Sequence, residues 1–387
     1  MRPFPTLAVL LIAAPLLAPL AAGGQTKPAA AKQAAAPQEI VIGHVAGYTG
    51  PVRDNALELA QGAQVLFDAV NESGGFNGRK FRILVADDQF KPENTVQLVA
   101  EMKGKAVALL PINGSANAAA LIKDGTLGLP LVGTIPSPDV VRNWKNPNLF
   151  HIRASDREQA ERILEQLVTI GLTNIALLVP NNPFGEQSTK IAEAYLARRN
   201  LKLAANAVYL LAGPKADLEP GLKALQGKSY QALVILGPPN YVAEAIKRLR
   251  TSGETAQLYT LSYADAKVIV KEAGLKLAHG VVISQVMPNL NSRALPLVRE
   301  LHEHLARYGK TKAEATYFNI EGYIAAKLIV EAIRRSRDPS PEGVRRGLEQ
   351  IQGYDLGGFV IDFSPAKHHG SSFVDLSLIG GSGRLVY

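Results

Sequence analysis

The chain has 387 residues, no cysteine and a formal net charge of +8. Without cysteine it can form no disulfide, and it offers no thiol for a lipid anchor. The basic residues are scattered and lack the interleaved aromatic residues of a nucleic-acid surface. We therefore attribute the charge to solubility and predict no nucleic-acid partner.

The N-terminal residues have the three parts of a secretory signal peptide. Arg2 supplies a positive charge, Leu7 to Leu20 is almost entirely apolar, and small residues follow at 21–24. The apolar run is short for a membrane span, which makes an uncleaved anchor the less favoured alternative. We predict a signal peptide over residues 1–24, a flexible leader over residues 25–38, and export to the periplasm.

From Glu39 onward, apolar runs of strand length alternate with segments of helical periodicity. Such alternation is typical of a parallel sheet with helices on both of its faces. In the first series the predicted strands are 40–45, 81–85, 106–110 and 129–132, and the predicted helices are 55–71, 92–102 and a segment after Ser115.

A second series of the same kind begins after Arg153. Its predicted strands are 174–179, 207–211, 232–236 and 258–261, and its predicted helices are 157–170, 185–198, 218–225 and 241–251. The repetition predicts an α/β fold of two doubly wound parallel-sheet lobes rather than one large sheet.

The last third of the chain does not start a third series. It contains a predicted strand at 280–286, helices at 294–308, 316–336 and 341–352, and strands at 359–363 and 373–378. We expect the helices to cover the first lobe and the final two strands to return to the second. The expected bounds are residues 39–152 plus 284–357 for lobe 1 and residues 153–283 plus 358–387 for lobe 2.

Signals for catalysis are few. The chain has no GxSxG, Walker or HExxH motif, and its glycine cluster at 74–78 follows a helix, whereas a dinucleotide fingerprint follows a strand. We interpret Asp87-Asp88 as a turn that caps the next helix and His368-His369 as a solvated loop, with a metal site as the less favoured alternative for each. We predict no enzyme activity, no cofactor and no metal.

Loops at the ends of three predicted strands are candidates for a small-molecule site, because ligands of parallel sheets bind outside the carboxyl ends of the strands. Residues 113–117 precede a helix, whose free N–H groups and Ser115 hydroxyl could hold a carboxylate. Capping of that helix by Ser115 is an equally favoured alternative. Residues 135–137 offer a carbonyl and a hydroxyl group. In the loop at 182–185, Phe184 is placed to close over an apolar group.

Several short motifs follow one another in a characteristic order over nearly the whole mature chain. They are Gly50-Pro51, Gln61-Gly62-Ala63, the run from Asn71 to Lys80, Asp87-Asp88 with Pro92, Gly114-Ser115, Leu129 to Val132, and Asn182 to Gly185. In these motifs the chain, from Glu39 to about Ser377, resembles the type I periplasmic binding proteins. The resemblance is to the branched-chain amino acid (leucine/isoleucine/valine) binding group of ABC importers.

The resemblance implies two lobes joined by three crossover segments, which close on a ligand in the cleft between them. In members that bind amino acids, the loops matching residues 113–116 and 136–137 hold the ligand carboxylate and ammonium. An aromatic residue at the position of Phe184 packs on the ligand, and the residue matching Asn55 lines the cleft. The implied partners are a small-molecule ligand and an ABC-transporter permease in the inner membrane.

The chain departs from this pattern in the second lobe. Where the amino acid binders carry an acid for the ammonium, it has Ser262 with Tyr263 beside it. A buried ammonium without a carboxylate partner is costly, so the ligand could be an amide or a carboxylate without an amine as well as an amino acid. The candidate ligand-binding residues are Asn55, Asn113, Gly114, Ser115, Ala116, Pro136, Ser137, Phe184, Ser262 and Tyr263.

These expectations define one function and two alternatives. We predict an exported, monomeric solute-binding protein that captures a small ligand and delivers it to an ABC importer. A periplasmic ligand-sensing subunit of a membrane receptor is the first alternative, since it would use the same fold. An exported enzyme is the least favoured, because a fold alone establishes no chemistry.

Overall fold

The computed structural model describes residues 39–50, 52–135, 137–212, 215–309 and 314–387. The predicted signal peptide, the leader and the candidate residue Pro136 lie outside these ranges. Within them, no helix combines the length and the apolar character that a membrane crossing requires.

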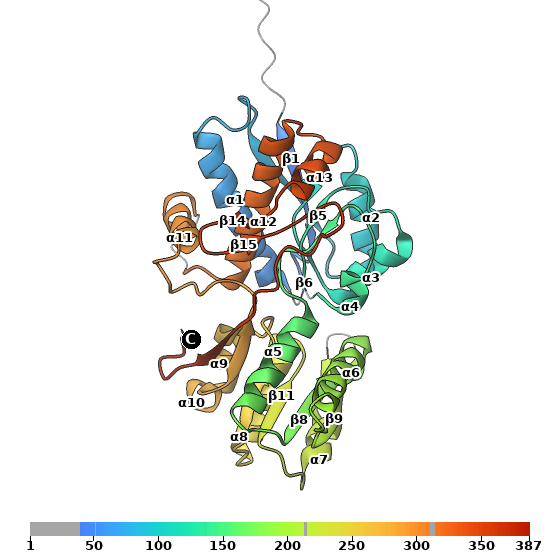
Figure 1. The fold of residues 1–387 in the computed structure, drawn as a ribbon, viewed down its shortest axis with the longest axis vertical. Coiled ribbons are helices and arrows are strands. Elements are labelled where there is room, and N and C mark those ends of the chain that lie inside the picture. The colour runs from blue at the N-terminus through green and yellow to red at the C-terminus, as the bar shows by residue number, and fades with distance from the viewer. Residues whose placement is uncertain (1–38, 51, 136, 213–214, 310–313) are drawn as a thin grey trace, which may run out of the picture. The chain divides into compact units, whose positions relative to one another are not determined.

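The first sheet is parallel throughout and has the strand order β2-β1-β3-β5-β7. Two of its strands, β1 and β5, are labelled in Figure 1. Its strands are β1 Ile40–Ala46, β2 Phe81–Asp87, β3 Ala108–Leu109, β5 Leu131–Val132 and β7 Leu149–Phe150. The helices between them in the chain are α1 Arg53–Glu72, α2 Pro92–Met102, α3 Ser115–Asp124 and α4 Asp139–Arg142. Beyond β3 and β5, a short parallel pair is formed by β4 Ile112–Asn113 and β6 Thr134–Ile135.

The second sheet has the strand order β10-β9-β8-β11-β12-β13-β16-β17. Its parallel part comprises β8 Ile175–Pro180, β9 Ala205–Ala212, β11 Ala232–Ile235, β12 Gln257–Thr260 and β13 Val282–Gln285. Antiparallel strands flank it on both sides, namely β10 Lys215–Asp217, β16 Asp375–Ile379 and β17 Leu385–Val386. Its helices are α5 Asp156–Thr169, α6 Pro183–Ala197, α7 Glu219–Leu225, α8 Pro239–Thr251, α9 Ala266–Ala273 and α10 Leu275–Ala278.

The two-lobed α/β architecture expected from the two series is confirmed, and the long helices of the last third cover the first lobe as expected. These helices are α11 Pro296–Tyr308, α12 Tyr317–Ser336 and α13 Pro341–Glu349. The expectation that both final strands return to the second lobe is wrong for one of them. Strand β15 Val360–Ile361 pairs with β14 Tyr354–Asp355, and Ile361 and Phe363 pack in the hydrophobic core of the first lobe. The chain stays with the first lobe as far as Gly370, whose N–H donates to the His151 carbonyl at 2.8 Å, and crosses to β16 after it.

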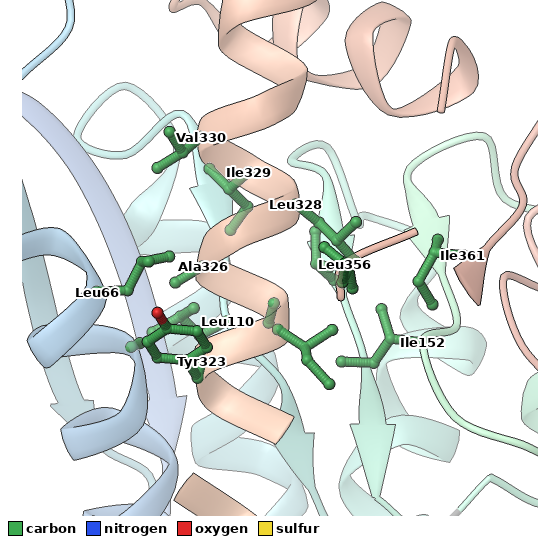
Figure 2. Packing of buried hydrophobic residues seen from close by; sticks show 14 of the residues in the cluster. Leu66, Leu110, Ile152, Tyr323, Ala326, Leu328, Ile329, Val330, Leu356 and Ile361 are labelled. Carbon is green, nitrogen blue, oxygen red and sulfur yellow. The ribbon is translucent and has the colours of Figure 1, made fainter. Parts of the chain in front are cut away.

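The core of the first lobe is built around the crossing of α1 and α12. Figure 2 shows Leu66 of α1 beside Tyr323 and Ala326 of α12 in one buried cluster. Two glycines allow the helices to approach closely. A Cβ atom on Gly322 would lie 2.0 Å from the Leu59 carbonyl oxygen, and one on Gly62 would lie 1.9 Å from the Asn319 carbonyl oxygen. No larger residue fits at either position without separating the helices.

Capping side chains fix the residues at which α5 and α12 begin. At α5, Ser155 Oγ accepts a hydrogen bond from the Glu158 N–H at 3.1 Å, and Glu158 Oε2 accepts one from the Ser155 N–H at 2.7 Å. Thr316 and Asn319 form the same reciprocal capping box at α12. Both helices thus start at defined residues beside the segments that connect the lobes.

Candidate functional site

The first candidate loop ends β4 and opens α3. The Gly114 N–H donates to the Ile135 carbonyl at 2.6 Å, and its φ of 100° is a conformation that glycine adopts readily. Gly114 is itself the N-cap of α3, so the alternative of capping by Ser115 is wrong. Ser115 is half-buried in the first turn, and Ala116 is exposed.

Asn113, at the end of β4, is the most unusual residue of this loop. Its side chain is buried, and neither its amide nitrogen nor its amide oxygen has a hydrogen-bond partner among the described residues. A buried polar group without a partner destabilises a fold by about 1–3 kcal/mol. A solute that reached this amide could satisfy both of its atoms.

Ser137 follows β6 and is tied to the start of α5. Its N–H donates to Asp156 Oδ1 at 3.1 Å, and its carbonyl accepts from the Asp156 N–H at 3.2 Å. Its hydroxyl is buried and has no partner among the described residues. Asp156 therefore links a loop of the first lobe to the first helix of the second.

Ser262, in the loop after β12, is held by Arg153. Arg153 Nη2 donates to Ser262 Oγ at 2.6 Å, and Arg153 Nη1 lies 3.4 Å from Glu321 Oε2 of α12. The Arg153 and Glu321 side chains are each only 3% exposed. In addition, the Ser262 N–H donates to Gln159 Oε1 of α5 at 3.1 Å. One buried guanidinium thus joins residues from both lobes.

Tyr263 and Phe184 complete the second-lobe side. The two rings meet edge to face with centroids 6.1 Å apart, and the Arg153 guanidinium lies 5.6 Å from the centre of the Tyr263 ring. Phe184 is held in the first turn of α6, where Asn182 Oδ1 caps the helix by accepting from the Gly185 N–H at 3.1 Å. Burial raises the pKa of the Tyr263 hydroxyl, and the nearby negative charge of Asp156 raises it further, although no hydrogen bond of ordinary geometry joins the two groups.

The buried charged groups near Ser262 are two carboxyl groups and one guanidinium. Burial raises the pKa of Asp156 to about 6 and raises that of Glu321, while the positive charge of Arg153 opposes both shifts. Asp156 Oδ2, Glu321 Oε1 and Arg153 Nε have no hydrogen-bond partner among the described residues. We call Arg153, Asp156, Ser262, Tyr263 and Glu321 the buried polar cluster. It has the capacity to donate to and accept from the polar groups of a small solute.

A cavity of about 360 Å³ adjoins this cluster at Ser262. It is lined by the loop after β12, the segment before α11, the first turn of α12 and β17. Its volume lies in the range of small-molecule sites, about 300–1,000 Å³.

The structure brings together most of the candidate residues. Ser137, Phe184, Ser262 and Tyr263 are connected through Asp156 and Arg153, and Asn113 and Gly114 adjoin them through the β4–β6 pair. Asn55, half-buried in the first turn of α1, has no hydrogen bond to the other candidates within the described part of the chain.

Sequence reasoning missed Arg153, Asp156 and Glu321. Arg153 marked only the break between the two series, and Asp156 lay just outside the predicted helix at 157–170. A signal for Glu321 did exist, because it is a lone acid in an otherwise apolar face of a predicted helix. Such an acid is rarely buried without a charged partner.

The two metal alternatives have structural explanations. Asp88 is buried and accepts hydrogen bonds from the Phe90 N–H at 2.8 Å and from Thr95 Oγ1 at 2.6 Å, which confirms the strand-end turn. The expectation that this turn caps the next helix is wrong, because the N-cap of α2 is Lys91 and no side chain caps it. The interpretation of His368-His369 as a solvated loop is wrong. His368 stacks on Phe150 with ring centroids 4.0 Å apart, and His369 Nε2 lies 2.9 Å from the Arg142 carbonyl oxygen. Among the described residues, no group of three or more His, Cys, Asp or Glu side chains is placed to hold a metal ion.

Comparison with known proteins agrees with this architecture. Residues 39–376 match the family described as periplasmic binding protein. Leu/Ile/Val-binding protein homolog 3 of Brucella melitensis biotype 1 is 29% identical over 130 residues, which are 33% of this chain and 35% of that protein. The matched part thus spans about a third of the length of this curated relative.

Two solved structures extend the likeness to nearly the whole chain. A substrate-binding periplasmic protein from Ralstonia solanacearum is 31% identical, with a TM-score of 0.82 over 90% of this chain and 99% of that one. A branched-chain amino acid ABC transporter protein from Thermus thermophilus, solved with bound valine, is 21% identical, with a TM-score of 0.78 over 90% of this chain and 95% of that one. The second likeness shows the fold alone.

Proposed function

The chain belongs to the periplasmic binding protein family, and from this premise we propose that it is an exported solute-binding protein. It captures one small ligand between its lobes, without turnover, and delivers it to an ABC importer. The observation that carries the proposal is the convergence of Asn113 and Ser137, from the first lobe, with the buried polar cluster next to a cavity. Buried polar groups without partners are what a bound solute would satisfy.

The proposed ligand is an amino acid, an amide or a small carboxylate. Ser262 is not the only group available to a ligand ammonium, since the carboxylates of Asp156 and Glu321 lie in the same cluster. The names of the curated relative and of the Thermus thermophilus protein favour branched-chain amino acids as the first compounds to test.

The proposed mechanism is closure of the two lobes about three crossover segments. The bounds proposed from the sequence are adjusted at one point, so that the third crossover follows Gly370. Arg153 belongs to the first crossover and contacts both lobes, which makes it the residue most sensitive to their relative position. A ligand that contacts both lobes favours the closed state. Small-angle scattering tests this, and an unchanged radius of gyration on ligand addition would contradict closure.

The proposed route is export by the signal peptide at 1–24, action as a monomer in the periplasm, and docking to a permease in the inner membrane. Mass spectrometry of solute that co-purifies with the chain would identify the ligand directly. Permease genes next to the gene for this chain would support import, whereas a gene for a membrane receptor kinase would favour the sensing alternative.

The direct test is a screen of amino acids, amides and carboxylates for a rise in melting temperature, since a ligand that binds only the native state stabilises it. Asn113→Ala should weaken the binding of any compound found by about tenfold, because a buried hydrogen bond is lost only in the complex. In the ligand-free chain the same variant loses no hydrogen bond.

Asn117→Ala is the matched control for this test. The Asn117 amide donates to Thr95 Oγ1 at 2.7 Å and to Asp88 Oδ2 at 3.1 Å, so its role is structural. Its removal should lower the melting temperature of the ligand-free chain, which Asn113→Ala should leave nearly unchanged. If no compound raised the melting temperature of the unaltered chain, the proposed function would be wrong.

A further inference from the structure

The lining of the cavity beside Ser262 combines apolar surface with five charged side chains. Its cationic side chains are Lys267, Arg293 and Arg384, and its acidic side chains are Asp265 and Glu314. An aliphatic group placed here would remove water from charged groups without offering them a partner, which is unfavourable. A leucine-like side chain would therefore leave the charged part of this lining without a partner.

The two acids of the lining are already engaged by groups of the chain. The Glu314 carboxylate is shared between Lys267 Nζ at 3.8 Å and Arg384 Nη2 at 3.6 Å. Asp265 Oδ1 caps α9 by accepting from the Lys267 N–H at 2.7 Å. The acids thus have partners in the chain, and one of them serves two cations.

Arg293 differs from the other charged groups of the lining. It is exposed in the segment before α11, and within the described ranges its guanidinium has no hydrogen bond or ion pair. Arginine presents a planar fork of donors that suits a carboxylate. The cavity therefore contains one cation that no acid within the described ranges neutralises.

A nearby acid does not neutralise the positive charge of Arg293. Glu58 of α1 accepts a hydrogen bond from Thr316 Oγ1 at 2.8 Å, behind the wall of the cavity that α12 forms. Burial raises the pKa of Glu58 to about 7, so near neutral pH it carries only part of a negative charge.

We propose that this cavity receives the outer end of the solute, and that this end carries a carboxylate bound by Arg293. The inference rests on the proposed function and narrows it, because it favours acidic solutes over aliphatic ones. The inner end of the same solute lies at Ser262, where the cavity meets the buried polar cluster.

The test compares solutes that share a carbon chain and differ only at the outer end. Glutamate, glutamine and norvaline form one series, and glutarate and pentanoate form a second series without the amine. Isothermal titration calorimetry on the unaltered chain should give tighter binding, by about tenfold or more, for the member of each series that ends in a carboxylate. Arg293→Gln should abolish this preference and change the affinity for norvaline and pentanoate less than twofold.

Arg299→Gln is the matched control, because Arg299 is an exposed arginine of α11 that does not line the cavity. It makes the same change in charge and should keep the preference. Equal or tighter binding of norvaline or pentanoate would overturn the inference, as would an equal loss in both arginine variants. If leucine or an amide bound while neither glutamate nor glutarate did, the inference would fail and the proposed function would stand. If no compound of the wider screen bound either, both would fail.

Discussion

Helix α12 takes part in two regions of opposite character, and they meet at neighbouring residues. Gly322 lies against the backbone of α1, at a crossing that is closed by apolar packing. Glu321 is equally buried but faces Arg153 in the buried polar cluster. In the first region close packing leaves no space for even one added carbon atom. In the second, three charged side chains each keep an atom that has no partner in the described part of the chain.

The difference shows that burial alone does not indicate what a residue contributes. Apolar packing at the crossing stabilises the first lobe, and nothing in it remains available to a solute. The polar cluster contributes less net stability, because removing charges from water offsets much of their attraction. Its unpartnered atoms are instead available to bind. The predictions below test this contrast, from the largest expected effect to the smallest.

Glu321→Ala should have the largest effect, a loss of about 3–5 kcal/mol in the free energy of unfolding, because it leaves a buried guanidinium without its charged partner. Urea unfolding followed by circular dichroism would measure it. The double variant Arg153→Met with Glu321→Leu removes both charges and should be close to neutral. A loss of less than about 1 kcal/mol in the single variant would mean that the cluster is not sealed from water.

Asp156 should make the stability depend on pH. Its pKa is raised from 3.8 in the unfolded chain to about 6 in the folded one, so the folded chain binds more protons between these values. Its contribution to stability is therefore greatest below pH 4, falls as the pH rises to 6, and is constant above that. At one pKa unit per 1.36 kcal/mol, the fall is about 3 kcal/mol.

Asp156→Asn removes this titration while keeping the shape of the side chain. The stability advantage of the unaltered chain over the variant should decline between pH 4 and pH 7 in parallel urea titrations. A difference that stayed constant over this range would show that the carboxyl group is not buried in the way the structure places it.

Gly322→Ala should destabilise the chain by about 1–3 kcal/mol, because the new methyl group separates α1 from α12. The melting temperature of the ligand-free chain would report it. Gly381→Ala is the control and should have almost no effect, since a Cβ atom there meets nothing within 4 Å. Equal effects of the two substitutions would argue against a close crossing.

Ser155→Ala should have the smallest effect, about 1 kcal/mol, because it removes one half of the capping box of α5. Ser155→Thr keeps both the acceptor for the Glu158 N–H and the donor to Glu158 Oε2, and should recover most of the loss. If Ser155→Ala instead weakened ligand binding more than it lowered stability, the capping box would belong to the site and the contrast drawn here would need revision.

Much of the fold could be predicted from the sequence, because strand and helix periods are local properties. Helix α12 was expected at 316–336 and begins one residue later, where Thr316 forms its cap. Helix α9 was missed, since Val268, Ile269 and Val270 in its centre have weak helix propensity and the helix depends on packing against α8. Strand β17 was missed because only its pairing with β16 makes it a strand.

The candidate site, like the fold, could be predicted from the sequence only in part. By itself the sequence determined which loops end the strands, and so pointed to Asn113, Ser137 and Phe184, because strand ends follow from local hydrophobic patterns. Ser262 was proposed only from the resemblance to the family. Only the tertiary structure decided that Arg153 meets Ser262, 109 residues away, and Glu321, 168 residues away. A buried charge takes its partner from whatever the topology places beside it, and no local pattern contains that information.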